Sequence, residues 1–307
     1  MGGSYRMGRG LCLVGMALAT LATVGVRPAT ADVAVPITLT GWNADVVTDA
    51  NPATRFAQQF DFGSTTGGLS AWFEQGILFN GAPLTNGLPS GQNFTSQINN
   101  SVTGTPSVFS LLPANGNNVL RTSTNLGVPS ATLTLTTPGR YSSLAVLAST
   151  GAAFGFGTGT LTLHFSDGTS SAPLSYDAPD WNIFVGGDTS RVALGPVGRS
   201  DDLGNGTGFL YTPSEGSQFV MYETDLNLAA LGLDTRTLTS ITFTSATNAP
   251  NPGGITGVFA VSGVASPSGV AVPEPGTLAL LSIGTLGLLS RGWRRGRAGR
   301  AHVGPGR

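Results

Sequence analysis

The alternation of apolar and hydroxylated residues constrains the fold of this 307-residue chain more than any other feature. Leucine and threonine alternate in Ala131–Thr137, and Gly159–Ser166 repeats the pattern just before the turn dipeptide Asp167-Gly168. A period of two places one set of side chains on each face of a β-strand. Tyr141–Ser149 is apolar almost throughout, which predicts a strand at the centre of a buried sheet.

Similar runs recur along the chain, separated by Gly, Pro, Asn and Asp, and helical periodicity is scarce. They are Ile37–Val47, Phe219–Leu226, Ser240–Ser245 and Ile255–Gly263. This pattern predicts an all-β protein with a single two-sheet β-sandwich of jelly-roll type over residues 32–265. Residues 266–271 are predicted to form a linker, because proline, serine and glycine gather there.

Composition restricts the partners of the 32–272 region. Its six arginines stand against fifteen acidic residues, a net charge of −9, and the whole chain has no lysine. An acidic surface argues against nucleic acid and anionic membranes as partners, and it is compatible with calcium or neutral glycans. The one cysteine, Cys12, precedes this region, so its stability must come from a hydrophobic core rather than from disulfides.

Residues 1–31 have the three parts of a secretory signal peptide. Two arginines lie among the first ten residues, Leu11–Val26 is apolar, and Ala29-Thr30-Ala31 is an A-x-A cleavage site. Signal peptidase and the export machinery are therefore expected partners. Cleavage after Ala31 would leave Asp32 as the first residue of the mature protein.

The C-terminal tail also has three parts. Val272-Pro273-Glu274-Pro275 precedes the uncharged, mostly apolar segment Thr277–Ser290. A basic cluster follows, made of Arg291, Arg294, Arg295, Arg297 and Arg300. The apolar segment predicts a short transmembrane helix of roughly 21 Å, against ~30 Å of hydrocarbon, with its basic end in the cytoplasm. An ordinary C-terminal membrane anchor behind a proline linker is the alternative.

The order of motif, apolar helix and arginine-rich end over residues 272–300 resembles the PEP-CTERM sorting signal of Gram-negative bacteria. The resemblance implies that an exosortase, a membrane cysteine transpeptidase, recognises the tail and cleaves at or near Pro273-Glu274-Pro275. It implies a transient inner-membrane anchor, followed by delivery to the cell surface or extracellular matrix. The surroundings of such proteins are rich in exopolysaccharide, as in a biofilm matrix.

The predicted sandwich also resembles the galactose-binding-like domains of bacterial surface proteins. A DGT turn, a DW loop and a closing strand recur in such domains. The matching stretches here are Ser166–Ser170, Asp177–Trp181, Leu238–Phe243 and Val258–Gly263. The resemblance implies a fold type and does not place a ligand.

Several kinds of catalytic and metal site are excluded by residue counts. His164 is the only histidine in 32–272, and no cysteine accompanies it, so the usual zinc sites cannot form. No G-x-S-x-G elbow presents a serine nucleophile, and a phosphate-binding P-loop needs a lysine. We expect His164 to face solvent, because Leu161, Leu163 and Phe165 share the other face of its strand.

Paired carboxylates leave glycoside hydrolysis open, since that reaction needs two acids facing a sugar. The candidate pairs are Asp177 with Asp180, Glu223 with Asp225, and Asp201 with Asp202. Acids in turns are more often turn formers, so we expect no catalytic residue and no cofactor. A structural calcium ion is a further hypothesis, with Asp167, Asp201 and Asp202 as ligands.

An aromatic ring beside carboxylates suits a sugar, whose C–H face stacks on the ring while the acids bind its hydroxyls. The best local cluster is Tyr176, Asp177, Asp180 and Trp181, which we predict to bind glycan. Core packing is the alternative for each tryptophan, and Trp42, inside the first predicted strand, is assigned to the core.

Three functions remain open from sequence. The first is a non-catalytic surface or matrix protein that contacts exopolysaccharide, and this is the function we predict. The second is a structural adhesin without a small ligand, and the third is a secreted carbohydrate-active hydrolase. An exposed Trp181 would favour the polysaccharide-contacting protein. Buried tryptophans and a flat Thr/Ser surface would favour the structural adhesin, and two carboxylates that face each other in a cleft would favour the hydrolase.

Overall fold

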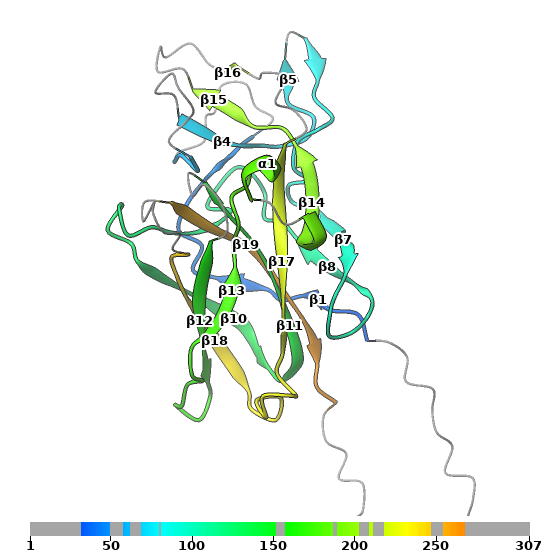
Figure 1. Cartoon of the computed structure of the whole chain (residues 1–307), viewed down its shortest axis with the longest axis vertical. Helices are drawn as coiled ribbons and strands as arrows, with labels where there is room; N and C mark the ends of the chain where they lie inside the picture. Colours follow the sequence, from blue (N-terminus) through cyan, green and yellow to red (C-terminus); the bar gives the residue numbers. More distant parts are fainter. Residues whose placement is uncertain are drawn as a thin grey trace, which may run out of the picture.

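A computed structural model describes residues 32–49, 58–61, 69–79, 81–151, 157–186, 189–202, 209–210, 218–246 and 254–267. Strands dominate this part of the chain (Figure 1). The described helical elements are the four-residue helix α1 (Ile183–Gly186) and the 3-10 turn η1 (Thr189–Arg191). The predicted all-β class is therefore confirmed, whereas the jelly-roll and galactose-binding-like assignments stay predictions.

A six-stranded antiparallel sheet forms the centre of the domain. Its order is β1-β19-β11-β17-β14, and β9 also pairs with β19. The strands are β1 (Val35–Pro36), β9 (Leu120–Thr122), β11 (Tyr141–Gly151), β14 (Val192–Val197), β17 (Phe219–Asn227) and β19 (Ile255–Ala265). β11 is buried from Ser143 to Gly151, which confirms the buried central strand expected from its apolar run.

A five-stranded antiparallel sheet contributes the second layer, in the order β13-β12-β18-β10-β2. Its strands are β2 (Leu39–Thr40), β10 (Ser130–Gly139), β12 (Thr158–Phe165), β13 (Leu174–Asp177) and β18 (Leu238–Thr244). Burial alternates along β12, with Leu161, Leu163 and Phe165 inside. These residues pack with Leu144 and Val146 of β11 in one hydrophobic core, so the two sheets bury their facing sides against each other.

A third layer covers the other face of the six-stranded sheet. It includes β3 (Val47–Thr48), β4 (Leu69–Phe73) and the hairpin of β7 (Asn93–Asn99) with β8 (Pro106–Ser110). Phe109 of β8 and Trp72 of β4 join a second core with Phe259 of β19. The loop-rich stretch 81–118 thus folds onto the six-stranded sheet, which explains why β11 and β19 are buried on both faces.

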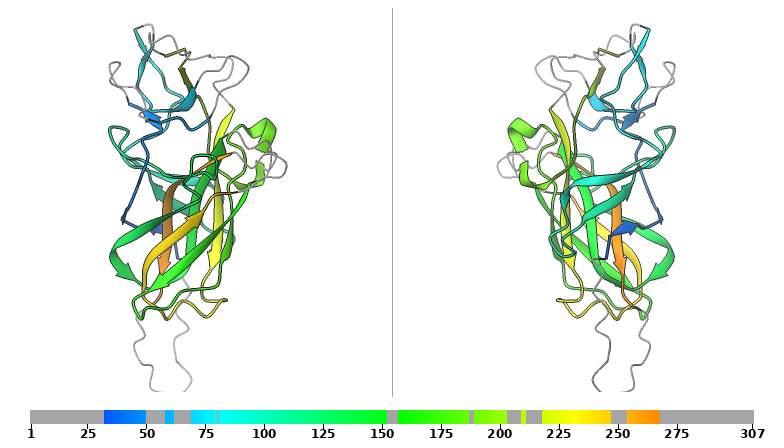
Figure 2. Two further views of the ribbon diagram at one scale, coloured as in Figure 1. Left: turned by 90° about the vertical axis from the view of Figure 1, so that its left-hand side faces the viewer. Right: turned by 90° about the vertical axis from the view of Figure 1, so that its right-hand side faces the viewer.

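The remaining strands lie at one end of the domain (Figure 2). They are β5 (Leu78–Phe79), β6 (Ala82–Pro83), β15 (Ser200–Asp202) and β16 (Phe209–Leu210). Val35 of β1 pairs with Gly263 of β19, so the first and last strands that the structure describes are neighbours.

The continuous strand predicted over Ile37–Val47 is not observed. The chain leaves β2 after Thr40 and turns at Gly41, whose φ is 102°. A Cβ atom at this position would lie 2.5 Å from the Thr132 carbonyl oxygen, so the turn requires glycine. The turn brings Trp42 out of the strand, so its side chain is only half-buried.

None of the helices that the structure describes has the length and apolar character that a membrane crossing requires. The predicted signal peptide, the sorting motif and the transmembrane segment 277–290 all lie outside the described residues.

Candidate functional site

The predicted glycan cluster does not form an exposed aromatic surface. Tyr176 is fully buried in the first core, and Trp181 is 1% exposed in the second. The Trp181 backbone N–H donates to the Thr150 carbonyl (2.8 Å), which holds this loop against β11 and turns the ring inward. The alternative of core packing therefore applies to both rings, and the prediction that they stack on a sugar is corrected.

The two acids of that cluster take part in local structure. Asp180 is 5% exposed, and its Oδ1 accepts a hydrogen bond from the Asn182 N–H at 2.8 Å. Asp177 is half-buried, forms an ion pair with Arg191 and accepts a hydrogen bond from Thr158 Oγ1. Both carboxylates are thus committed to turn and ion-pair geometry rather than directed at an open site.

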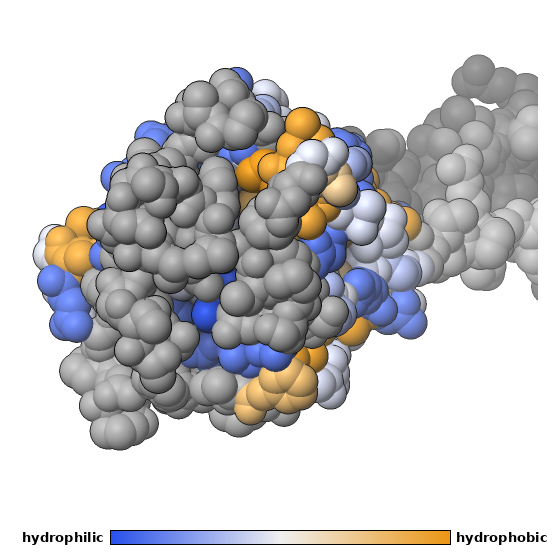
Figure 3. Space-filling model, turned by 90° about the horizontal axis from the view of Figure 1, so that it is seen from above, coloured by the Kyte–Doolittle hydropathy of each residue, from blue (hydrophilic) through white to orange (hydrophobic). Residues whose placement is uncertain are grey.

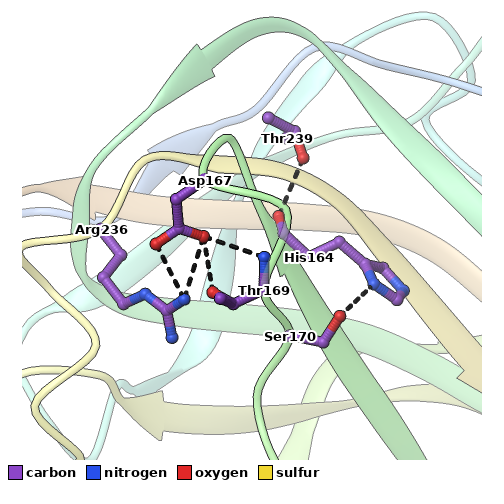
Figure 4. Close-up of polar contacts among 6 residues, drawn as sticks. All are labelled: His164, Asp167, Thr169, Ser170, Arg236 and Thr239. Atoms are coloured by element: carbon purple, nitrogen blue, oxygen red, sulfur yellow. Dashed lines mark hydrogen bonds and ion pairs between the residues drawn. The ribbon is translucent and has the colours of Figure 1, made fainter.

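Asp167 lies in the exposed turn after β12, where Figure 4 shows it between Thr169 and Arg236. Its Oδ1 accepts from the Thr169 N–H at 3.0 Å, and Arg236 Nη2 lies 3.0 Å from Oδ2. Hydrogen bonds from Thr169, followed by the Arg236 charge, lower the pKa of Asp167 to about 2. Arg236 also covers the Phe165 ring at 4.0 Å, which fixes the ion pair over the end of the sheet.

The three predicted calcium ligands are not brought together. Asp167 follows β12 at one end of the domain, whereas Asp201 and Asp202 belong to β15 at the other end (Figure 1). Sequence reasoning grouped them by residue type, and only the strand order reveals their separation. Among the described residues, no group of three or more His, Cys, Asp or Glu could hold a metal ion.

His164 lies on the outer face of the five-stranded sheet, opposite Leu163 and Phe165, as alternation predicts. It is half-buried, with Nδ1 2.8 Å from Ser170 Oγ (Figure 4) and Nε2 2.8 Å from Thr242 Oγ1. Thr242 Oγ1 also lies 2.8 Å from Thr132 Oγ1 on the neighbouring strand. The histidine is therefore part of a hydroxyl network, which leaves no carboxylate partner of the kind that a catalytic triad uses.

A groove opens at the surface beside the β7–β8 hairpin. We call it the Trp42 groove; it has a volume of about 390 Å³ and is lined by Pro36, Ile37, Thr38, Leu39, Trp42, Asn93, Ser110, Leu112, Ala260 and Val261. It lies where the chain crosses from β1 in one sheet to β2 in the other. None of its lining residues is charged, and Asn93 and Ser110 are cross-strand partners on the hairpin.

Trp42 is half-buried, which corrects its assignment to the core. Its ring packs against the first core, and its Nε1–H donates to the Leu39 carbonyl at 3.0 Å. The bond fixes the indole over the edge of β2, so an aromatic ring borders the groove. The sequence did not reveal that Trp42 borders a groove, although Gly41 just before it was a signal that the strand could end there.

Glu223 and Asp225 share one face of β17, as their spacing predicts, and the tip of the β7–β8 hairpin covers them. Asn100 Nδ2 is 2.7 Å from Asp225 Oδ1 and 3.4 Å from Glu223 Oε1. Ser107 Oγ donates to Glu223 Oε1 at 2.5 Å. Burial first, and then the neighbouring Asp225, raises the pKa of Glu223 to about 7 despite this hydrogen bond.

Exposed apolar side chains are scattered. Viewed from the end that carries β5 and β15, the described surface shows separate apolar areas among hydrophilic ones (Figure 3). The most exposed large apolar residues are Val35, Leu78 and Phe184, which come from distant parts of the chain. This end of the domain therefore offers no continuous apolar platform among the described residues.

Comparison with known protein families identifies the C-terminal tail as a sorting signal. The family described as the PEP-CTERM protein-sorting motif matches residues 271–295. The chain carries a PEP-CTERM sorting signal. The match includes the predicted motif Val272–Pro275, the apolar segment and the first arginines of the basic cluster. It confirms the resemblance drawn from those residues and identifies the chain as an exported protein that an exosortase sorts to the cell surface.

Comparisons over the rest of this PEP-CTERM chain assign no activity. No curated protein sequence matches it. Among solved structures, the Agl-KA catalytic domain aligns at 12% identity and a TM-score of 0.24, over 52% of this chain and 23% of that one. The enzymatically active domain of bacteriophage CBA120 tailspike protein 4 aligns at 14% identity and a TM-score of 0.21, over 58% and 18%. The chain thus spans less than a quarter of either structure.

Proposed function

We propose that this PEP-CTERM protein contacts a neutral exopolysaccharide at the cell surface through the Trp42 groove, without catalysing a reaction on it. The groove carries the proposal, because it combines an aromatic ring with an amide and a hydroxyl and has no charged lining residue. Its volume lies within the ~300–1,000 Å³ typical of ligand pockets. The proposal keeps the predicted function but moves the site from Trp181 to Trp42.

Charge favours a neutral ligand over an acidic one. The 32–272 region carries six arginines against fifteen acids, so an anionic polysaccharide would be repelled as it approached. A neutral sugar ring could stack on the indole, while Asn93 and Ser110 offer donors and acceptors for its hydroxyls.

Two of the three candidate carboxylate pairs, Glu223 with Asp225 and Asp177 with Asp180, support a binding role rather than hydrolysis. Glycoside hydrolysis needs two acids with access to a sugar. Glu223 has a pKa suited to a general acid, but it is 2% exposed beneath the hairpin. Asp177 and Asp180 are occupied by an ion pair and a turn.

Replacing Trp42 with alanine should weaken polysaccharide binding on the order of tenfold, or about 1.4 kcal/mol, because aromatic anchors dominate such contacts. Affinity electrophoresis in gels that contain exopolysaccharide purified from the producing cells, or neutral glucans, measures the effect. Trp42→Phe should bind with intermediate affinity, because it keeps an aromatic ring but loses the hydrogen bond to Leu39.

Phe184→Ala is the matched control, since it removes an aromatic ring that is 76% exposed and does not line the groove. It should migrate like the wild type. Circular dichroism establishes that each variant is folded. Equal retardation of the wild type and Trp42→Ala would contradict the groove as the binding site. No retardation of the wild type by any of these polysaccharides would favour the structural adhesin.

A further inference from the structure

Asn100, at the tip of the β7–β8 hairpin, connects the hairpin to β17 through one side chain. Its Nδ2 lies within hydrogen-bond distance of Asp225, Glu223 and Ser107. Its Oδ1 accepts from the N–H groups of Val102 (2.9 Å) and Thr103 (3.1 Å). The same residue therefore holds the carboxyl pair on one side and shapes the turn of the hairpin on the other.

Asp225 adds a second contact with the tip. Its Oδ2 accepts a hydrogen bond from the Ser101 N–H at 2.6 Å. The tip is thus attached to the sheet by polar contacts with two neighbouring acids. Phe109, nearer the other end of the hairpin, is fully buried in the second core and fixes that part independently. The two ends of the hairpin are consequently held by different forces.

The carboxyl pair lies in a poor environment for two negative charges. Asn100 and Ser107 are fully buried, and Glu223 is 2% exposed. Glu223 Oε2 is buried without a hydrogen-bond partner. An ionised carboxylate in this position has donors at Oε1 only and keeps a buried, unpaired Oε2, whereas a protonated one avoids most of the cost of burying the charge.

No described cationic side chain compensates for this. β7, β8 and the loop between them contain no ionisable side chain, and neither does β14. β11 contributes only Tyr141, at its first residue, and Asp32 approaches the tip through its carbonyl oxygen, which accepts from Thr105 Oγ1. Of the arginines that flank β14, Arg191 pairs with Asp177 and Arg199 lies over the Phe219 ring.

We propose that Asn100, Glu223 and Asp225 form a proton-dependent latch that docks the tip of the β7–β8 hairpin, residues 99–106, onto β17. When the pair holds one proton, a single negative charge faces the Asn100 amide and the tip is docked. When that proton is lost, the buried Glu223 carboxylate and the half-buried Asp225 carboxylate repel each other and draw water, and the tip opens. Phe109 keeps the base of the hairpin in place.

The direction of the pH effect follows from the raised pKa of Glu223, about 7 against a usual value of 4.5. The docked state binds a proton more tightly than the open state does. Stability of the docked tip is therefore full below pH 4.5, declines as pH rises, and is lost through pH 7. This is the reverse of the effect expected for a carboxylate in an ion pair. It does not depend on whether the Trp42 groove binds glycan.

Hydrogen exchange of the tip amides tests the latch on the protein from Asp32 onward, since Asn100 accepts from Val102 and Thr103. After correction for the intrinsic pH dependence of exchange, protection of these amides should fall at least about tenfold between pH 5.5 and 8.5, with most of the fall complete by pH 7. Glu223→Gln, which cannot ionise, should keep its protection across this range. The Ser123 and Val128 amides, which pair in a distant turn, serve as the internal control.

Asp225→Asn provides a second variant if Glu223→Gln does not fold. Removing the neighbouring charge should move the wild-type transition to lower pH. The proposal is overturned if wild-type protection is constant from pH 5.5 to 8.5, or if Glu223→Gln shows the same step as the wild type. A fall in protection shared by the control turn would indicate global loosening and would also overturn it.

Discussion

In cells that contain a matching exosortase, the mature protein is expected to begin at Asp32 and to end near Pro273–Pro275. The PEP-CTERM motif at 271–295 is the basis for the second terminus, and the A-x-A site for the first. In cells without exosortase the chain should keep the basic cluster and stay in the membrane fraction. Intact mass and terminal peptides of the protein from both kinds of cell measure the difference.

Replacing Pro273, Glu274 and Pro275 with alanine should abolish processing even when exosortase is present, because the enzyme recognises this motif. Ser268→Ala, in the adjoining linker, is the matched control and should be processed like the wild type. A chain that retains Arg291 and the residues after it in exosortase-positive cells would show an ordinary membrane anchor instead. The groove and latch inferences do not depend on that outcome.

Trp181→Ala is expected to reduce the free energy of unfolding by about 3–5 kcal/mol, as large-to-small changes in a core do. The ring centroid lies 5.0 Å from that of Trp72, 5.1 Å from that of Phe60 and 4.5 Å from that of Phe219. Its Nε1–H also donates to Asp61 Oδ2 at 2.9 Å, and the substitution removes this bond. Since domains are stable by only about 5–15 kcal/mol, the variant should be close to unfolding at 37 °C.

Urea unfolding followed by circular dichroism measures this loss. Trp42→Ala is the matched comparison, because it removes the same side chain from a half-buried position and should cost distinctly less. Trp181→Phe should fall between the two, since it keeps an aromatic ring in the cluster. Equal stabilities of Trp181→Ala and Trp42→Ala would contradict the assignment of Trp181 to the core.

Patterns of neighbouring residues in the sequence predicted the features of this protein that depend on short stretches of chain, namely its strands and its sorting signal. Alternation in β10 and β12 decided which side chains face the core, because neighbouring residues of a strand point to opposite faces. The sorting signal could also be predicted from sequence, because the PEP-CTERM family is defined by a linear order of motif, apolar segment and arginines. The spacing of Glu223 and Asp225 likewise placed both on one face of β17.

Only the tertiary structure decided which aromatic ring is exposed and which acid is perturbed. Trp181 and Trp42 both stand beside turn residues, but a third layer of chain covers one and the Gly41 turn leaves the other at a groove. Glu223 obtains its raised pKa first from burial beneath the β7–β8 hairpin, more than a hundred residues away in sequence, and then from Asp225, although the Ser107 hydroxyl on that hairpin donates a hydrogen bond that lowers it. The burial and the electrostatic environment of a side chain are sums over contacts between segments that are distant in sequence. The amino-acid sequence by itself therefore determined the strands and the cell-surface destination, whereas the packing of the three layers determined the Trp42 groove and the Glu223–Asp225 pair.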